Sequence, residues 1–309
     1  MIVTLTLNPA IDRNVTTDRL AFEDRSYILS AHETAGGRGI NASRVIHEFG
    51  AKTAAIAISG GGTRKRFEAL LAKLDFPVHL VRVKNDIRSN LTITDERGLT
   101  VKLNEFGPQI DKDELKAIEH TVTENLAGAD WLMICGSFPP GIPPEFCKEL
   151  VALAKKHKVK TLLDTDGEAL VQGIAGGPTV VAPNQQEAER LLKRALLTRN
   201  HCIEALDRLL AMGVESVILS LGSRGAMSAK EGHMAEAVPP RVEACCPIGA
   251  GDALAAAFVW ALNEGQDFFT ATRWGVAAGT ASALLPGVAF ATIAQTKAIF
   301  KDVELRQVR

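Results

Sequence analysis

The chain has 309 residues, of which 46% are hydrophobic and 23% are charged, and its formal net charge is −1. This composition excludes wholesale disorder and lacks the basic excess typical of proteins that bind nucleic acid. No window of about 18 uninterrupted apolar residues occurs, so no membrane span is expected. Met1–Leu7 is strand-like and has none of the features of a signal peptide, which predicts a cytoplasmic protein.

Short apolar runs alternate with amphipathic stretches along most of the chain. The runs that predict strands are Ile2–Leu7, Thr53–Ser59, Val78–Val83, Trp131–Cys135, Thr161–Asp164, Thr179–Ala182 and Val217–Leu221. The stretches that predict helices are Lys65–Leu74, Asp111–Leu126, Glu145–Lys156, Gln186–Arg194 and His201–Met212, with two close-packed alanine-rich helices over Asp252–Leu285. This alternation predicts an α/β fold with a mostly parallel central sheet and helices on both faces.

Two segments do not fit a buried parallel sheet. Arg13–Glu33 and Arg88–Leu103 read as strands in which polar and apolar residues alternate. We expect them to form a small antiparallel β flap, or lid, from about residues 13–34 and 87–103. The flap would stand off a single domain of residues 1–309.

The strongest local signal is Pro247–Asp252, with the sequence PIGAGD, which precedes an alanine-rich helix. Small residues allow a tight turn whose backbone N–H groups point the same way, and the helix dipole adds partial positive charge. Asp252 would face an anion held there, which suits a general base for a hydroxyl that attacks a phosphoryl group. From this segment alone, an ordinary N-cap aspartate after a glycine turn is the favoured explanation.

A second glycine-rich segment, Gly36–Ser43 (GGRGINAS), also opens a helix. Its match to the dinucleotide-binding fingerprint is weak, because that motif belongs after the first buried strand of a βαβ unit. The glycines would let a substrate approach the backbone, with Asn41 free to hydrogen-bond it. A plain glycine-rich helix start is the alternative.

Polar groups also follow two of the predicted strands. Asn8–Asp12 comes directly after the first, where an aspartate can accept hydrogen bonds from sugar hydroxyls, although an Asn-Pro turn alone would also give this pattern. Asn184 and Glu187 follow a later strand at a spacing that suits Mg²⁺ or its water shell. The same spacing is that of a helix capping box.

Two further turns follow strands. Ser220–Gly225 could lie against a nucleotide, and Gly136–Gly141 could place the Ser137 hydroxyl in a cleft. No Gly-Lys pair followed by Ser or Thr occurs, so a P-loop kinase is excluded.

In order and content these motifs resemble the ribokinase/PfkB family of carbohydrate kinases from end to end. Thr6–Asp12 is similar to the opening of its sugar-phosphate branch, which includes 1-phosphofructokinase, tagatose-6-phosphate kinase and the minor 6-phosphofructokinase. Gly37–Asn41 and Gly249–Asp252 match the two family signatures, and Asn184 with Glu187 matches its Mg²⁺-associated motif. The resemblance implies a ribokinase-like fold and an ATP-dependent kinase that phosphorylates a hydroxyl of a ketohexose phosphate.

The resemblance also implies roles at the reacting end. Asp252 would be the base, and Gly249, Ala250 and Gly251 would form the anion hole. Mg²⁺ would lie at Asn184 and Glu187, and ATP would contact a set of polar and glycine residues: Asn184, Ser220, Gly222, Gly225 and Gly251. Some relatives also hold a monovalent cation near the segment matching Leu284–Val288.

At the acceptor end, Asp12, Gly37, Gly39 and Asn41 would bind the sugar. Arg88, assisted by Ser137, would bind the phosphate already on the substrate, because a guanidinium fork matches phosphate geometry. Arg25 matches a basic position that, in some relatives, reaches across a dimer to this phosphate, and the flap would form the homodimer interface.

Two positions depart from the family pattern. Pro247 replaces the usual Ser or Thr and removes a backbone N–H beside the anion hole. Arg38 stands where sugar-phosphate relatives have lysine or glycine, and it could reach a phosphate or lie in solvent. The alternatives left open are a kinase of an unphosphorylated sugar or nucleoside, and a sugar-binding relative without catalysis.

Overall fold

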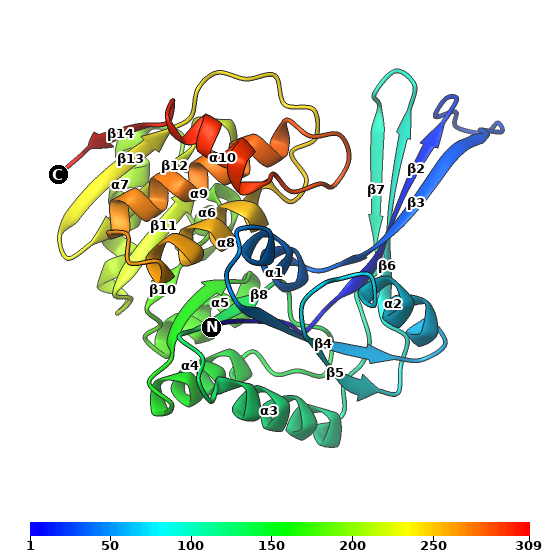
Figure 1. Ribbon diagram of the computed structural model, residues 1–309, viewed down its shortest axis with the longest axis horizontal. Coiled ribbons are helices and arrows are strands. Elements are labelled where there is room, and N and C mark those ends of the chain that lie inside the picture. Colours follow the sequence, from blue (N-terminus) through cyan, green and yellow to red (C-terminus); the bar gives the residue numbers. More distant parts are fainter.

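The computed structural model describes residues 1–309, which form a large sheet covered by helices and a small second sheet that projects from it (Figure 1). In spatial order the strands of the large sheet are β14 (Glu304–Gln307), β13 (His233–Val238), β12 (Ala226–Lys230), β11 (Ser216–Ser220), β10 (Val180–Val181), β9 (Lys160–Asp164), β8 (Trp131–Cys135), β1 (Ile2–Thr6), β4 (Thr53–Gly60) and β5 (Val78–Val83).

Most of this sheet is parallel. All neighbouring pairs from β5 to β11 are parallel, whereas β11 to β14 form an antiparallel extension at one edge. Every residue of β1 and β4 is buried. Their uninterrupted apolar runs reflect this, because a parallel strand with helices on both faces has no side facing water.

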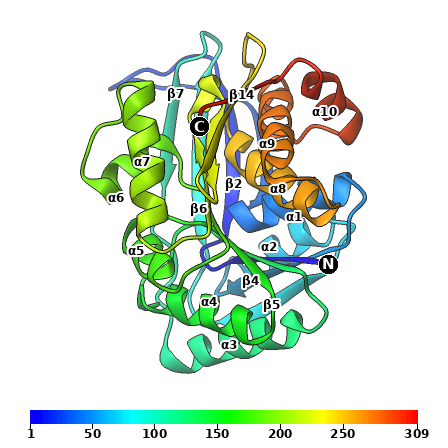
Figure 2. The same ribbon diagram turned by 90° about the vertical axis from the view of Figure 1, so that its left-hand side faces the viewer.

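The helices lie in two layers (Figure 2). They are α1 (Arg38–Glu48), α2 (Arg64–Leu71), α3 (Lys112–Leu126), α4 (Phe146–Lys156), α5 (Gly167–Ala175), α6 (Gln185–Leu192), α7 (Arg199–Ala211), α8 (Ala250–Asn263), α9 (Phe268–Ala283) and α10 (Ile293–Phe300). Side chains of α3 to α7 join one apolar core, and those of α1, α8 and α9 join a second core on the other face. The predicted α/β architecture is confirmed.

Helices α8 and α9 pack closely, as their alanine content predicts. A Cβ added to Gly275 would lie 2.8 Å from the carbonyl oxygen of Leu254, and one added to Gly279 would lie 2.8 Å from that of Ala250. Such distances leave no room for a side chain. The two glycines therefore fix the position of α8, whose first turn carries Asp252.

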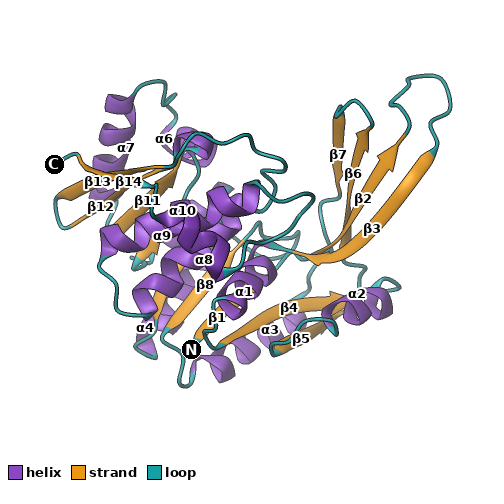
Figure 3. Ribbon diagram, turned by 45° about the horizontal axis from the view of Figure 1, so that its top comes forward, coloured by secondary structure: helices purple, strands orange, loops and turns teal.

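The second sheet, called the lid here, consists of β2 (Ala10–Thr17), β3 (Ile28–Gly36), β6 (Arg88–Asp95) and β7 (Thr100–Asn104), in the order β3-β2-β6-β7 (Figure 3). Its outer pairs are antiparallel, as predicted, but its central pair, β2 and β6, is parallel. The parallel pair follows from the large sheet, because β2 and β6 each come after a parallel strand and leave the same edge in the same direction.

Some elements were not predicted from the sequence. These are α5, and β12, β13, α10 and β14 nearer the carboxyl terminus. Predicted boundaries otherwise differ from the observed ones by a few residues, as with Lys65–Leu74 for α2. None of the helices combines the length and the apolar character needed to cross a membrane.

Candidate active site

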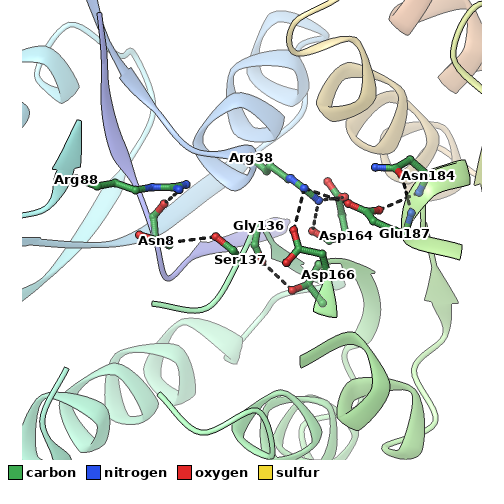
Figure 4. Close-up of polar contacts among 10 residues, drawn as sticks. Asn8, Arg38, Arg88, Gly136, Ser137, Asp164, Asp166, Asn184 and Glu187 are labelled. Atoms are coloured by element: carbon green, nitrogen blue, oxygen red, sulfur yellow. Dashed lines mark hydrogen bonds and ion pairs between the residues drawn. The ribbon is translucent and has the colours of Figure 1, made fainter. Parts of the chain in front are cut away.

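The predicted site residues gather where the parallel strands end. Asn8 follows β1, Ser137 follows β8, Asp164 ends β9 and Asn184 follows β10. The carboxyl ends of parallel strands are the edge at which open α/β sheets bind ligands. Figure 4 shows these side chains beside Arg38, which enters from α1.

Asp252 lies in the first turn of α8 and faces α1. Nδ2 of Asn41 donates a hydrogen bond of 2.7 Å to Oδ2 of Asp252. Burial raises the pKa of Asp252 to about 7; the nearby Asp164 carboxylate adds to this rise, and the Asn41 hydrogen bond opposes it. A carboxylate with a pKa near neutrality is suited to accept a proton at physiological pH.

The loop before Asp252 leaves several backbone donors free. Gly249 adopts a φ of 83°, a left-handed conformation that suits glycine, and α8 begins at the next residue. The N–H groups of Gly249, Gly251 and Asp252 form no hydrogen bond, whereas that of Ala250 donates to the Pro247 carbonyl oxygen at 3.2 Å. The predicted anion hole therefore has free donors at Gly249 and Gly251, while the Ala250 donor is used within the turn.

A second polar centre lies at the base of the lid. Nη2 of Arg88 donates to the carbonyl oxygen of Asn8 at 3.0 Å, and Nδ2 of Asn8 donates to Oγ of Ser137 at 3.1 Å (Figure 4). Burial lowers the pKa of Arg88, with the nearby Asp12 carboxylate opposing that shift. Arg88 and Ser137, predicted to share a phosphate, are thus linked through Asn8.

Asp12 lies beside this centre. Nδ2 of Asn90 donates to Oδ1 of Asp12 at 2.8 Å, and burial raises the pKa of Asp12. Oδ1 of Asn8, Nε of Arg88 and Oδ1 of Asn90 are buried without a hydrogen-bond partner. Buried polar atoms are normally paired, so the unpaired atoms of Arg88 and Asn90, two residues that act on the Asp12 carboxylate, favour a polar ligand here. The sequence had not singled out Asn90.

Packing explains the three glycines at the start of α1. A Cβ on Gly37 would lie 2.5 Å from Cγ2 of Thr6, and one on Gly39 would lie 2.5 Å from Oγ1 of the same residue. A Cβ on Gly36 would overlap the Asp12 carboxylate, at 1.9 Å from its Oδ2. Gly37 and Gly39 therefore bring α1 against β1, and their predicted contact with a sugar stays a prediction.

Arg38 points at three carboxylates. Nη1 lies 3.0 Å from Oδ1 of Asp164, and Nη2 lies 3.2 Å from Oδ2 of Asp166 and 3.1 Å from Oε1 of Glu187 (Figure 4). Burial raises the pKa of Asp164 and of Glu187, and Arg38 opposes both shifts. From the sequence, Arg38 was expected either to reach a phosphate or to lie in solvent. Neither alternative included these ion pairs.

Asn184 and Glu187 begin α6 as a complete capping box. Oδ1 of Asn184 accepts from the Glu187 N–H at 2.9 Å, and Oε2 of Glu187 accepts from the Asn184 N–H at 2.9 Å. No group of three His, Cys, Asp or Glu side chains is arranged to hold a metal ion directly. The donor set still fits Mg²⁺ bound through water. Oε1 of Glu187 faces the positively charged guanidinium of Arg38, and Mg²⁺ keeps several of its waters in proteins.

A cavity of about 780 Å³ opens beside the start of α8. All the residues predicted to contact the nucleotide line it: Asn184, Ser220, Gly222, Gly225 and Gly251. A parallel bridge between Asn184 and Ser220 holds two of them side by side. The cavity is large enough for a nucleotide-sized ligand.

Other parts of the site were missed by sequence reasoning. The cavity wall formed by α9 and by residues 238–244 carried no motif. Asp164 and Asp166 did carry a signal, because they follow an apolar strand in the same way as Asn8 and Asn184. Arg25, predicted to bind substrate, is exposed between β2 and β3 in the lid, and the single chain does not bring it to the site.

Comparisons with known proteins agree with this geometry. Residues 3–295 match the model of the pfkB family carbohydrate kinases. The ATP-dependent 6-phosphofructokinase isozyme 2 of Escherichia coli (strain K12) is 32% identical over 97% of each chain. The 1-phosphofructokinase of Borreliella burgdorferi is 31% identical over 92% of each chain.

The fold of the chain is also similar to that of solved structures. The crystal structure of phosphofructokinase-2 from Escherichia coli, in complex with substrates and products, superposes with a TM-score of 0.91 at 32% identity, covering 97% of this chain and 98% of that one. The predicted ribokinase-like fold is confirmed. The chain belongs to the PfkB family of carbohydrate kinases.

Proposed function

We propose that this protein transfers the γ-phosphoryl group of ATP to a hydroxyl of a ketohexose phosphate. The observation that carries the proposal is the position of Asp252. Its carboxylate lies beside free backbone donors at the start of α8, next to the 780 Å³ cavity, and contacts Asn41 of the predicted sugar site. Relatives named 6-phosphofructokinase and 1-phosphofructokinase support the same acceptor class.

Asp252 and the backbone of the preceding loop have separate roles in the transfer. Asp252 accepts the proton of the acceptor hydroxyl while that oxygen forms a bond to the γ-phosphorus. The bond from this phosphorus to the β-phosphate oxygen breaks, and ADP leaves with its electron pair. The free N–H groups of Gly249 and Gly251 stabilise the charge on the phosphoryl oxygens.

Asn184 and Glu187 would hold Mg²⁺ through its waters at the edge of the nucleotide cavity. When bound, this ion neutralises phosphate charge. Within the chain, Arg38 and the capping box fix the orientation of the Glu187 carboxylate.

Arg88 and Ser137 support an acceptor that already carries a phosphate. Nε of Arg88 is buried without a partner, and its guanidinium shares a cluster with Asn8 and Ser137. A phosphate would supply the missing acceptor atoms, since Arg binds phosphate through paired hydrogen bonds. An unphosphorylated sugar would not supply these acceptor atoms to the Arg88 guanidinium.

The lid supports a homodimer as part of the same proposal. Several of its apolar side chains are more than half exposed: Phe22, Tyr27, Ile28, Leu29, Leu99, Leu103 and Phe106. Pairing of two lids would cover them and would bring Arg25 near the partner's site. Sedimentation should give a dimer for the native chain and a monomer for Leu29→Asp combined with Leu103→Asp; a native monomer would contradict this.

Asp252→Asn tests the reaction itself. Asparagine keeps the shape of the side chain and can still accept the Asn41 hydrogen bond, but it cannot accept a proton from the substrate. Turnover should fall by about 10²- to 10⁴-fold while circular dichroism stays native. Native-like turnover would remove Asp252 as the base.

A further inference from the structure

The cavity of about 780 Å³ beside α8 has a single charged side chain in its wall. Arg241 lies in the segment 239–249, which joins β13 to α8, and it is the only acidic or basic residue among those that line the cavity. The other lining residues are apolar, glycine or neutral polar residues, and none of them is aromatic. An anionic ligand in this cavity can therefore form an ion pair with one side chain of the wall, that of Arg241.

The segment that carries Arg241 is attached to the rest of the fold on both sides of this residue. A Cβ added to Gly225 would lie 2.7 Å from Cδ of Pro239, so the turn that contains Gly225 packs closely against the start of the segment. Further along, the N–H of Cys246 donates to the carbonyl oxygen of Ala283 in α9 at 3.0 Å. Gly225 and Ala283 both line the cavity, so the segment crosses one side of it between two fixed points.

The guanidinium of Arg241 has no partner within the chain. It is exposed to water and takes part in none of the ion pairs or side-chain hydrogen bonds of the structure. Other arginines of this region are paired: Nε of Arg199 lies 3.0 Å from Oε2 of Glu236, and Nη2 of Arg224 donates to Oε1 of Gln185. The cavity wall therefore has one cation, and that cation is free to bind a ligand.

The groups at the reacting end of the site are mainly acidic. Its carboxylates outnumber its cations, because one guanidinium, that of Arg38, lies among Asp164, Asp166, Glu187 and Asp252. Like charges repel, so these carboxylates oppose the binding of a polyphosphate. A cation in the wall of the cavity offsets this repulsion, and a guanidinium suits the task because it binds phosphate oxygens through paired hydrogen bonds.

We propose that Arg241 binds the nucleotide from the cavity wall, through an ion pair between its guanidinium and a phosphate oxygen of ATP. The inference rests on the proposed function, in which this cavity holds ATP. Arg241 strengthens nucleotide binding and takes no part in proton transfer, which belongs to Asp252. Loss of its charge therefore weakens nucleotide binding and leaves the acceptor site unchanged.

Calorimetric titration with ATP, ADP, AMP and adenosine, each in the presence of Mg²⁺, tests the ion pair. Arg241→Ala should bind ATP at least about fivefold more weakly than the native chain. The loss should shrink from ATP to AMP and vanish for adenosine, because the ion pair needs a phosphate. Arg241→Lys keeps a cation and should recover most of the ATP affinity. Added salt should narrow the difference between the native chain and Arg241→Ala, because dissolved ions screen an exposed pair.

Arg208→Ala is the matched control. Arg208 is exposed on α7, forms no ion pair and lies outside the cavity wall, so its loss should leave the affinity for all four compounds unchanged. Since Arg241 forms no ion pair or side-chain hydrogen bond, Arg241→Ala should melt at the native temperature. In steady-state assays the KM of this variant for ATP should rise while its KM for the acceptor stays at the native value.

The binding data separate this inference from the proposed function. Equal ATP affinity in Arg241→Ala and the native chain would overturn the inference. An equal loss for adenosine would also overturn it, because the guanidinium would then act on the base or the ribose. A native chain that binds none of the three nucleotides would instead contradict the proposed function.

Discussion

Nδ2 of Asn41 donates to Oδ2 of Asp252 across 2.7 Å, so a residue predicted to bind the sugar also holds the predicted base. This hydrogen bond favours the ionised form of Asp252 and keeps its pKa lower than burial alone would set it. The contact joins the first turn of α8 to α1, and so it links the two family signatures directly.

The pH dependence of catalysis follows from this contact. The base must be ionised, so kcat/KM for the acceptor should rise with pH and level off above about 7, the pKa of Asp252. Asn41→Ala removes a hydrogen bond to the ionised form, which raises the pKa and moves the acidic limb of the profile to higher pH. The control Asn125→Ala removes an amide bonded to Thr121 on α3 and should leave the limb in place. If the acidic limb of the profile lies at the native pH in Asn41→Ala, the hydrogen bond from Asn41 does not lower the pKa of Asp252.

Gly251 offers a test of the anion hole. An added Cβ would have no atom within 4 Å, and the position has no positive φ, so the fold does not require glycine there. Alanine is preferred over glycine in helices by about 0.5–1 kcal/mol, so Gly251→Ala should melt at the native temperature or above it. The methyl group would nevertheless crowd a phosphate at the free N–H, so we expect a raised KM for ATP and a lowered kcat.

Gly249→Ala is the contrasting variant. Gly249 has a φ of 83°, and an added Cβ would lie 3.0 Å from the Phe290 ring, so this change should lower the melting temperature. Native kinetics in Gly251→Ala would show that its N–H does not face the phosphates.

Arg88→Ala tests the acceptor phosphate. Hydrogen bonds to charged groups contribute about 1.5–3 kcal/mol, so the KM for a ketohexose phosphate should rise by about 10- to 100-fold. The change in kcat should be smaller, because the phosphate does not react. Arg97→Ala, in the turn between β6 and β7, serves as control and should leave KM unchanged. An unchanged KM in Arg88→Ala would place the phosphate elsewhere or remove it from the substrate.

The sequence predicted the elements that are strongly patterned. Ile2–Leu7 and Thr53–Ser59 are runs that only a strand covered on both faces explains, and β1 and β4 lie there. The antiparallel edge was missed, because β12 is built of small and polar residues (AMSAK) and β14 is exposed throughout. Neither segment has the alternation or the β-branched content that marks a strand.

Local motifs predicted which residues lie at the site but not how they pair. Asn184 and Glu187 were expected either as a capping box or as metal-facing groups, and the structure shows the capping box directly. The pairing of Arg38 with Asp164 joins residues 126 positions apart, and no local pattern encodes such a contact. The same holds for the Asn41–Asp252 hydrogen bond, which depends on how α1 and α8 pack.

The measurement that tests the central claim most directly is coupled ADP release with ATP and Mg²⁺ against a panel of acceptors. The panel contains fructose 1-phosphate, fructose 6-phosphate, tagatose 6-phosphate, fructose, ribose and adenosine. We expect turnover with a phosphorylated ketohexose and none with the three unphosphorylated compounds. Turnover only with fructose, ribose or adenosine would contradict the acceptor class, and no turnover with any of the six would contradict the proposed kinase activity.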